Sequence, residues 1–132
     1  MRKSLLAALP FAAALALALP AGAQPPVLIG KVGLHNAFRI SLTFPNGQLV
    51  RSIPAGTYTI VVHDYSRLHN FALGSATANV RIFTGSVPGI GTRTYTLALS
   101  PGTYVYACSA HPSVMHGTFV VTPAPSTTTT TG

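Results

Sequence analysis

Residues 104–121, YVYACSAHPSVMHGTFVV, contain two strand-like runs on either side of a short loop. The first run is rich in aromatic and β-branched residues and ends at Cys108, and a similar run begins at Thr118. The loop between them carries His111 and Met115. This pattern predicts two β-strands joined by a loop that presents a thiol, an imidazole and a thioether.

The rest of the chain repeats this organisation of short strands and turns. Apolar residues alternate with polar or small ones in two segments, with Ile40, Leu42 and Phe44 in one and Tyr95, Leu97 and Leu99 in the other. Such alternation is typical of strands that bury one face. Proline–glycine turn signals separate the runs at residues 45–47, 54–56, 88–89 and 101–102. We therefore expect an all-β, Greek-key β-sandwich of seven to eight antiparallel strands. The dense runs at 58–62 and 104–108 are predicted to be central strands buried on both faces.

Both ends of the chain differ from this central part. Residues 1–23 combine Arg2-Lys3, an Ala/Leu run and the small residues Ala21-Gly22-Ala23, which predicts a cleaved secretory signal peptide. The alternative is a membrane anchor, which needs about 18 or more uninterrupted apolar residues. Residues 24–122 are predicted to form the folded domain, and 123–132, with five consecutive threonines, a disordered tail. We expect an exported protein, periplasmic or otherwise extracytoplasmic, without a membrane span after cleavage.

Composition excludes several classes of function. The 132 residues include eight Lys or Arg, one acidic residue, Asp64, and one cysteine. A single carboxylate cannot form a paired acid/base site, and a lone cysteine cannot form an internal disulfide. The cations are scattered rather than clustered with aromatic residues, which argues against nucleic-acid binding. Because the positive charge is nearly unopposed, the pattern favours an acidic partner or an anionic surface, attracted weakly over long range.

The candidate site joins Cys108, His111 and Met115 to an upstream His69-Asn70 pair. One thiolate, two imidazoles and one thioether are the ligand set of blue-copper electron-transfer sites. Cys108 could instead be a small core residue, but an unpaired thiol is a liability in an exported protein. Met115 could likewise only fill space in the core.

Three other histidines and the one acidic residue are not expected to belong to the site. His116 competes with Met115 for the axial position, although a solvent-facing histidine is the favoured interpretation. His35 and His63 have no partner at ligand spacing and are interpreted as ordinary surface or strand residues. Asp64 is expected to form a local turn hydrogen bond or a weak ion pair with Arg67.

The sequence resembles the small bacterial cupredoxins of the plastocyanin, amicyanin and azurin superfamily. The matching pieces are residues 56–58, 68–71, 83–85, 101–104 and the Cys-x-x-His-Pro-x-x-Met-x-Gly motif of 108–117. The resemblance implies one type 1 copper ion with four ligands, His69, Cys108, His111 and Met115. It also implies that Asn70 ties the two ligand loops together. The His-Pro pair is similar to amicyanin, whereas the three-residue gap before Met115 is similar to azurin.

These features predict an electron carrier rather than an enzyme. Copper would cycle between Cu(II) and Cu(I) and exchange electrons with extracytoplasmic redox proteins that carry an acidic docking surface. The resemblance implies that His111 is the electron port, ringed by Ala110, Pro112 and Val114. We expect a monomer and no catalytic residues. One alternative is a copper carrier or buffer, which the single methionine left after cleavage disfavours. Another is a metal-free β-sandwich interaction module, which would leave the ligand spacing to coincidence.

Overall fold

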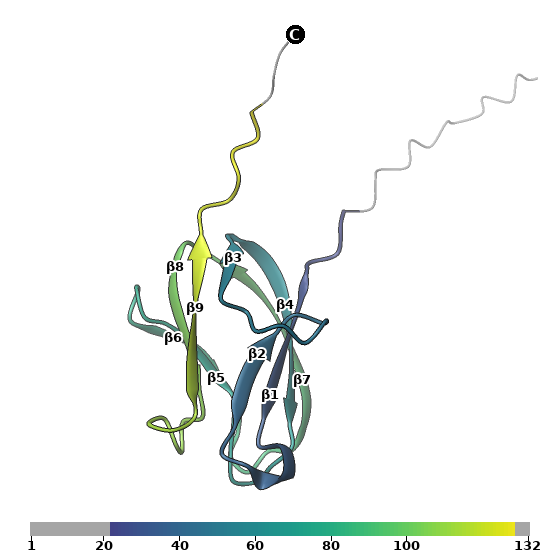
Figure 1. The fold of residues 1–132 in the computed structure, drawn as a ribbon, viewed down its shortest axis with the longest axis vertical. Helices are drawn as coiled ribbons and strands as arrows, with labels where there is room; N and C mark the ends of the chain where they lie inside the picture. The colour runs from purple at the N-terminus through teal and green to yellow at the C-terminus, as the bar shows by residue number, and fades with distance from the viewer. Residues whose placement is uncertain (1–21, 129–132) are drawn as a thin grey trace, which may run out of the picture.

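The computed structural model describes residues 22–128 and consists of two β-sheets laid face to face (Figure 1). The first sheet has the order β2-β1-β4-β7 and contains β1 (Val27–Val32), β2 (Ile40–Thr43), β4 (Gly56–Asp64) and β7 (Gly91–Leu99). The second has the order β3-β9-β8-β5-β6 and contains β3 (Ser52–Pro54), β5 (Ala72–Ser75), β6 (Val80–Thr84), β8 (Gly102–Ala107) and β9 (His116–Thr122). One 3-10 turn, η1 (Leu34–Asn36), links β1 to β2.

Most of the predicted signal peptide and the last four residues of the predicted tail fall outside this description. Residues 1–21 and 129–132 lie outside the described residues, so the structure does not bear on the predicted cleavage or on the end of the tail. Within residues 22–128, no helix has the length and hydrophobicity needed to cross a membrane.

The predicted all-β sandwich is confirmed, with two differences in detail. The described residues form nine strands rather than seven or eight, and two pairings, β1 with β4 and β3 with β9, are parallel. The additional strand β3 has only three residues, which is too short for an alternating pattern to be recognised. The parallel pairings were missed because alternation within a strand says nothing about the direction of its neighbour.

The hydrophobic core lies between the two sheets. The predicted inward residues Leu42 and Leu99 are buried there. Strands β4 and β8 are central as predicted, but the expectation that both of their faces are buried is wrong. In β4, Ile60 is buried while its neighbours Thr59 and Val61 are only partly covered. A two-layer sandwich covers one face of each sheet and leaves the other toward solvent.

Core packing also sets the relative position of the two segments that carry the candidate ligands. The ring of Phe71, two residues after His69, stacks on that of Tyr106, two residues before Cys108, with centroids 5.7 Å apart. Antiparallel pairing of β5 with β8 places Ala72 opposite Ala107. Together these contacts bring the His69 segment beside Cys108 at one end of the sandwich.

Candidate metal centre

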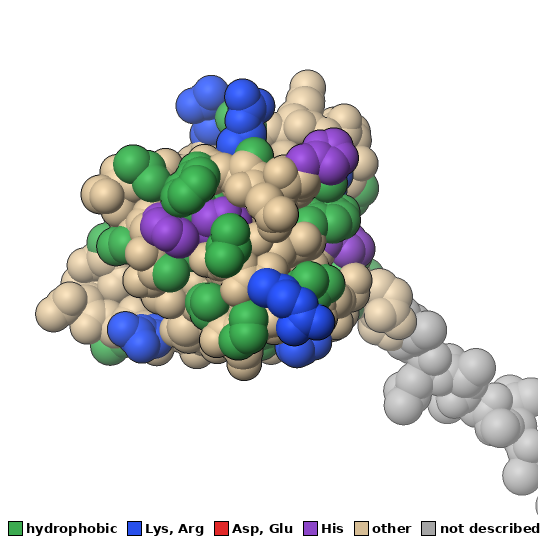
Figure 2. All heavy atoms as spheres, turned by 90° about the horizontal axis from the view of Figure 1, so that it is seen from below, with side chains coloured by type: hydrophobic (Ala, Val, Ile, Leu, Met, Phe, Trp, Pro, Cys, Tyr) green, Lys and Arg blue, Asp and Glu red, His purple; other side chains and the backbone are tan. Residues whose placement is uncertain are grey.

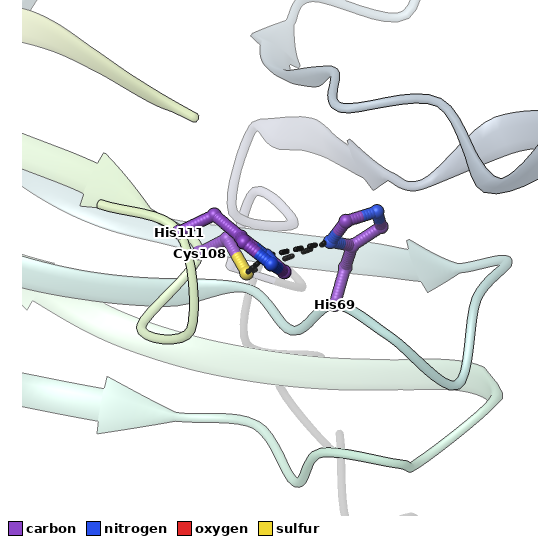
Figure 3. A group of neighbouring side chains, drawn as sticks. All are labelled: His69, Cys108 and His111. Atoms are coloured by element: carbon purple, nitrogen blue, oxygen red, sulfur yellow. Dashed lines mark hydrogen bonds between the residues drawn. The ribbon is translucent and has the colours of Figure 1, made fainter. Parts of the chain in front are cut away.

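Three predicted ligands converge at the end of the sandwich that lies lowest in Figure 1. Figure 3 shows the two imidazoles and the thiol directed toward one another. The Nδ1 atoms of His69 and His111 are 3.1 Å apart. The Sγ atom of Cys108 lies 3.9 Å from Nδ1 of His69 and 3.7 Å from Nδ1 of His111. His69 and Cys108 are fully buried, whereas His111 is partly exposed.

The spacing of these donor atoms fits one metal ion between them. Metal–nitrogen and metal–sulfur distances of about 2.0 and 2.3 Å place the two donors about 3.7 Å apart when the angle at the metal is about 120°. The observed sulfur–nitrogen distances of 3.7 and 3.9 Å agree with this value. The two Nδ1 atoms, 3.1 Å apart, are closer than the roughly 3.5 Å of the same geometry and correspond to an angle of about 100° at the metal. Two imidazoles and one thiolate in a roughly trigonal arrangement suit copper, although zinc also binds nitrogen and sulfur donors.

Local hydrogen bonds shape the loop that carries Cys108 and His111. The amide of His111 donates to the carbonyl of Cys108 (3.1 Å), and the amide of Met115 donates to the carbonyl of His111 (3.0 Å). The amide of Cys108 in turn donates to the carbonyl of Met115 (2.9 Å), which closes the loop. These successive turns fold His111 back toward the thiol three residues before it.

The other predicted residues of the loop have distinct environments. Met115 is buried at the end of the closed loop, and its role as an axial ligand stays a prediction. His116 is exposed at the start of β9, and its Nδ1 lies 2.8 Å from the carbonyl oxygen of Pro112, to which it donates. This position agrees with the solvent-facing interpretation of His116.

The remaining two histidines lie away from the cluster. His63 on β4 shares a hydrogen bond of 3.0 Å with the hydroxyl of Thr92, and exposed His35 belongs to the turn η1. Neither belongs to the group of potential metal ligands found among the described residues.

The buried His69 is oriented by a contact with the turn η1. Its Nε2 faces the carbonyl oxygen of Asn36 at 3.5 Å, and because a carbonyl can only accept, this contact favours the tautomer with the proton on Nε2. The Nδ1 lone pair is then free to face Cys108 and His111. The Asn36 side chain accepts a 2.9 Å hydrogen bond from the hydroxyl of Ser66, which holds this turn against the His69 segment. Such outer hydrogen bonds orient metal-binding histidines.

The predicted tie between the two ligand loops is present. The buried Asn70 donates from Nδ2 to the hydroxyl of Ser109 (2.7 Å) and to the carbonyl of Gly85 (2.8 Å). Its Oδ1 accepts from the amide of Ser109 at 2.7 Å. Asn70 therefore links the segment after β4 directly to the residue that follows Cys108.

We expect Asn70→Ala to lower the free energy of unfolding by about 2–4 kcal/mol, because it leaves buried donors and acceptors without partners. Urea unfolding of the metal-free protein measures this change. Asn46→Ala is the matched control, since Asn46 sits in an exposed turn and, among residues 22–128, its side chain forms hydrogen bonds only with Gln48. Equal destabilisation by the two substitutions would contradict the assigned role of Asn70.

Phe38 contacts the site and was missed by the sequence analysis. Its ring meets His69 and His111 edge-on, with centroids 5.0 and 4.8 Å apart, although 56% of its surface is exposed. Phe38 lies between η1 and β2, where no alternating pattern marks it. An isolated aromatic residue carries no local signal that it lies against ligands 31 and 73 positions away along the chain.

Asp64 forms the local turn hydrogen bond that was expected from the sequence. The amide of Ser66 donates to Oδ1 of Asp64 at 3.0 Å. Burial raises the pKa of Asp64, and the Ser66 hydrogen bond together with the nearby charge of Arg93 only partly offsets that rise. Since the folded state holds this proton to higher pH than the unfolded chain, the contribution of Asp64 to stability falls as pH rises above 3.8.

We therefore expect Asp64→Asn to stabilise the protein at pH 7 by less than about 1 kcal/mol, because the carboxylate is only partly buried and solvent screens its interactions. The asparagine oxygen can still accept from Ser66. Thermal unfolding at pH 3 and pH 7 tests this, and the gain should disappear at pH 3, where Asp64 is protonated. A lower Tm for the variant at pH 7 would refute the prediction.

Apolar side chains surround the candidate centre at the surface. Figure 2 shows hydrophobic side chains gathered around histidines on this face, with Lys and Arg near its margins and no acidic side chain in view. The predicted ring residues Ala110, Pro112 and Val114 are all exposed. The exposed end of the sandwich is therefore apolar at its centre and cationic around it.

No protein-family model matches the chain, and no curated protein matches it. Solved structures do resemble it. The copper protein rusticyanin is 18% identical with a TM-score of 0.56, over 72% of this chain and 76% of that one. A structure of rusticyanin from Thiobacillus ferrooxidans is 16% identical with a TM-score of 0.55, over 72% and 75%. Auracyanin A, a "blue" copper protein from Chloroflexus aurantiacus, is 21% identical with a TM-score of 0.53, over 74% and 99%.

Residues 22–128 thus form a two-sheet β-sandwich with a His-Cys-His cluster at one end. The fold of this chain is the cupredoxin fold. The predicted resemblance to the cupredoxins is thus confirmed at the level of the fold.

Proposed function

We propose that the protein is a one-electron carrier that holds a single copper ion and exchanges electrons between extracytoplasmic redox proteins. The observation that carries this proposal is the convergence of the His69, Cys108 and His111 donors at the spacing of one metal ion. Copper bound there supplies a Cu(II)/Cu(I) couple. Met115 is proposed as the weak fourth ligand, as in the His₂Cys-Met sites of blue-copper proteins.

The protein's own residues suit this role in three ways. Burial of Cys108 and His69 keeps water from two of the proposed ligands. Asn70 and the closed loop hold the ligands in place, so a change of charge at the metal needs little rearrangement. Partly exposed His111 would connect the centre with a docked partner. A carrier of this kind needs no catalytic residue.

The location of the protein and the charge of its partner are proposed from the sequence. We propose that cleavage after Ala23 releases residues 24–132 into an extracytoplasmic compartment, where the chain acts as a monomer with a net charge of +5. Six cations against Asp64 favour an acidic redox partner, since opposite charges accelerate encounter.

The test is a copper titration of residues 24–132 followed by visible absorption and electron paramagnetic resonance, and then by reduction with hexacyanoferrate(II) in a stopped-flow instrument. We expect one equivalent of copper to give an intense thiolate absorption that is bleached and restored reversibly. A pale signal that does not cycle would refute the proposal.

His111→Ala and His116→Ala form a matched pair for the electron port. Both alter a histidine of the same loop region, but only His111 faces the other proposed ligands. His111→Ala should slow electron transfer strongly with the fold intact, and His116→Ala should leave the rate within about twofold. Equal rates for both variants would argue against His111 as the port.

A further inference from the structure

A groove with a volume of about 460 Å³ lies beside the candidate metal centre. One wall comes from the end of β1, the start of β2 and the segment that joins them, and the other from the loop 108–115 and the start of β9. The groove thus opens between the two sheets at the end of the molecule seen in Figure 2. The side chains that matter for its chemistry are Lys31, Leu34, Phe38, Arg39, Val114 and His116.

The apolar part of the groove is in direct contact with the site. Phe38 lines the groove and also touches the rings of both His69 and His111. Leu34 and Val114 add exposed apolar surface, and Val114 belongs to the same loop as His111. A molecule seated here would be separated from two proposed ligands by a single aromatic ring.

The charged residues that line the groove are both cationic. Lys31 and Arg39 are both exposed at its lining, and Asp64, the one acidic residue of the sequence, is not among the lining residues. Neither cation is therefore neutralised by a carboxylate in the groove. An occupant that matches this lining must combine carboxylates with apolar side chains.

We propose that the groove docks an acidic, partly apolar segment of the redox partner. Its carboxylates would meet Lys31 and Arg39, and its apolar side chains would cover Phe38. This inference rests on the proposed function, because docking in the groove serves electron transfer by placing the partner beside His111. It differs from general charge attraction because it assigns the interaction to two of the six cations of residues 24–132.

The test compares two double variants of equal charge. Lys31→Glu with Arg39→Glu reverses the groove, whereas Arg51→Glu with Arg81→Glu makes the same change in net charge at exposed positions outside it. The probe is a blocked hexapeptide of alternating glutamate and leucine, with a lysine–leucine peptide as its control. Binding is followed by NMR on ¹⁵N-labelled protein, both without metal and after addition of Cu(I).

We expect the glutamate peptide to shift resonances around the groove, with at least tenfold weaker binding to the groove variant and less than threefold weaker binding to the control variant. Phe38→Ala should also weaken binding, unlike Leu49→Ala, which removes an exposed apolar side chain outside the groove. Equal weakening by both double variants, or no binding of the peptide at millimolar concentration, would overturn the proposal. Because the metal-free arm does not depend on copper, failure of docking can be distinguished from failure of the proposed electron carrier.

Discussion

Replacing Cys108 with serine is expected to abolish the intense visible absorption of the copper-loaded protein and to weaken copper binding by more than about a hundredfold. Loss of an outer-shell partner alone typically costs 10–100-fold in metal affinity, and Cys108 is a proposed direct ligand. Its Sγ lies 3.7 and 3.9 Å from the two facing imidazole nitrogens. A serine hydroxyl has nearly the same shape, but it does not supply a thiolate at neutral pH.

Visible absorption, electron paramagnetic resonance and competition with a copper chelator measure this effect. Ser113→Ala is a suitable control, because Ser113 is an exposed residue of the same loop and no hydrogen bond of its side chain is found among the described residues. Circular dichroism should show that both variants keep the β-fold. If the thiolate-like absorption band survives in the serine variant, Cys108 is not a ligand of the copper.

Gly33→Ala is expected to lower the free energy of unfolding by about 3 kcal/mol or more and to weaken copper binding. Gly33 has a φ of 70°, in the left-handed region that favours glycine. A Cβ atom there would lie 2.5 Å from Cβ of Ser66 and 2.9 Å from Cδ2 of His69. The substitution therefore adds backbone strain and also pushes on the segment that holds a proposed ligand.

Gly47→Ala separates these two effects. Gly47 also has a positive φ, 88°, but an added Cβ would meet nothing within 4 Å. We expect it to lower stability by only about 1–2 kcal/mol, the cost of left-handed backbone, without changing copper affinity. Urea unfolding and chelator competition on both variants measure the difference. If Gly33→Ala is no more disruptive than Gly47→Ala, the packing of Gly33 against His69 does not support the site.

The chain's strand pattern and the ligand loop could be predicted because their causes are local. Alternation at Ile40, Leu42 and Phe44 follows from the two-residue period of a strand over a core. The approach of His111 to Cys108 follows from successive turns within eight residues. Asn70 was predicted only through the resemblance to cupredoxins, since its partner Ser109 lies 39 positions away.

Other features arise only when distant segments pack together. The direction of β1 against β4 and of β3 against β9 depends on how the chain crosses between sheets, which side-chain alternation does not encode. Phe38 reaches His69 and His111 because the β1–β2 connection turns over the end of the sandwich.

The sequence alone determined an all-β fold and one loop with three potential metal ligands, because strand periodicity and turn hydrogen bonds act between near neighbours. The tertiary structure decided that His69 faces that loop, that Phe38 covers both imidazoles and that Lys31 and Arg39 share a groove beside them. These contacts join residues from separate strands and loops, and they form only after sheet register and core packing have set the distances between them.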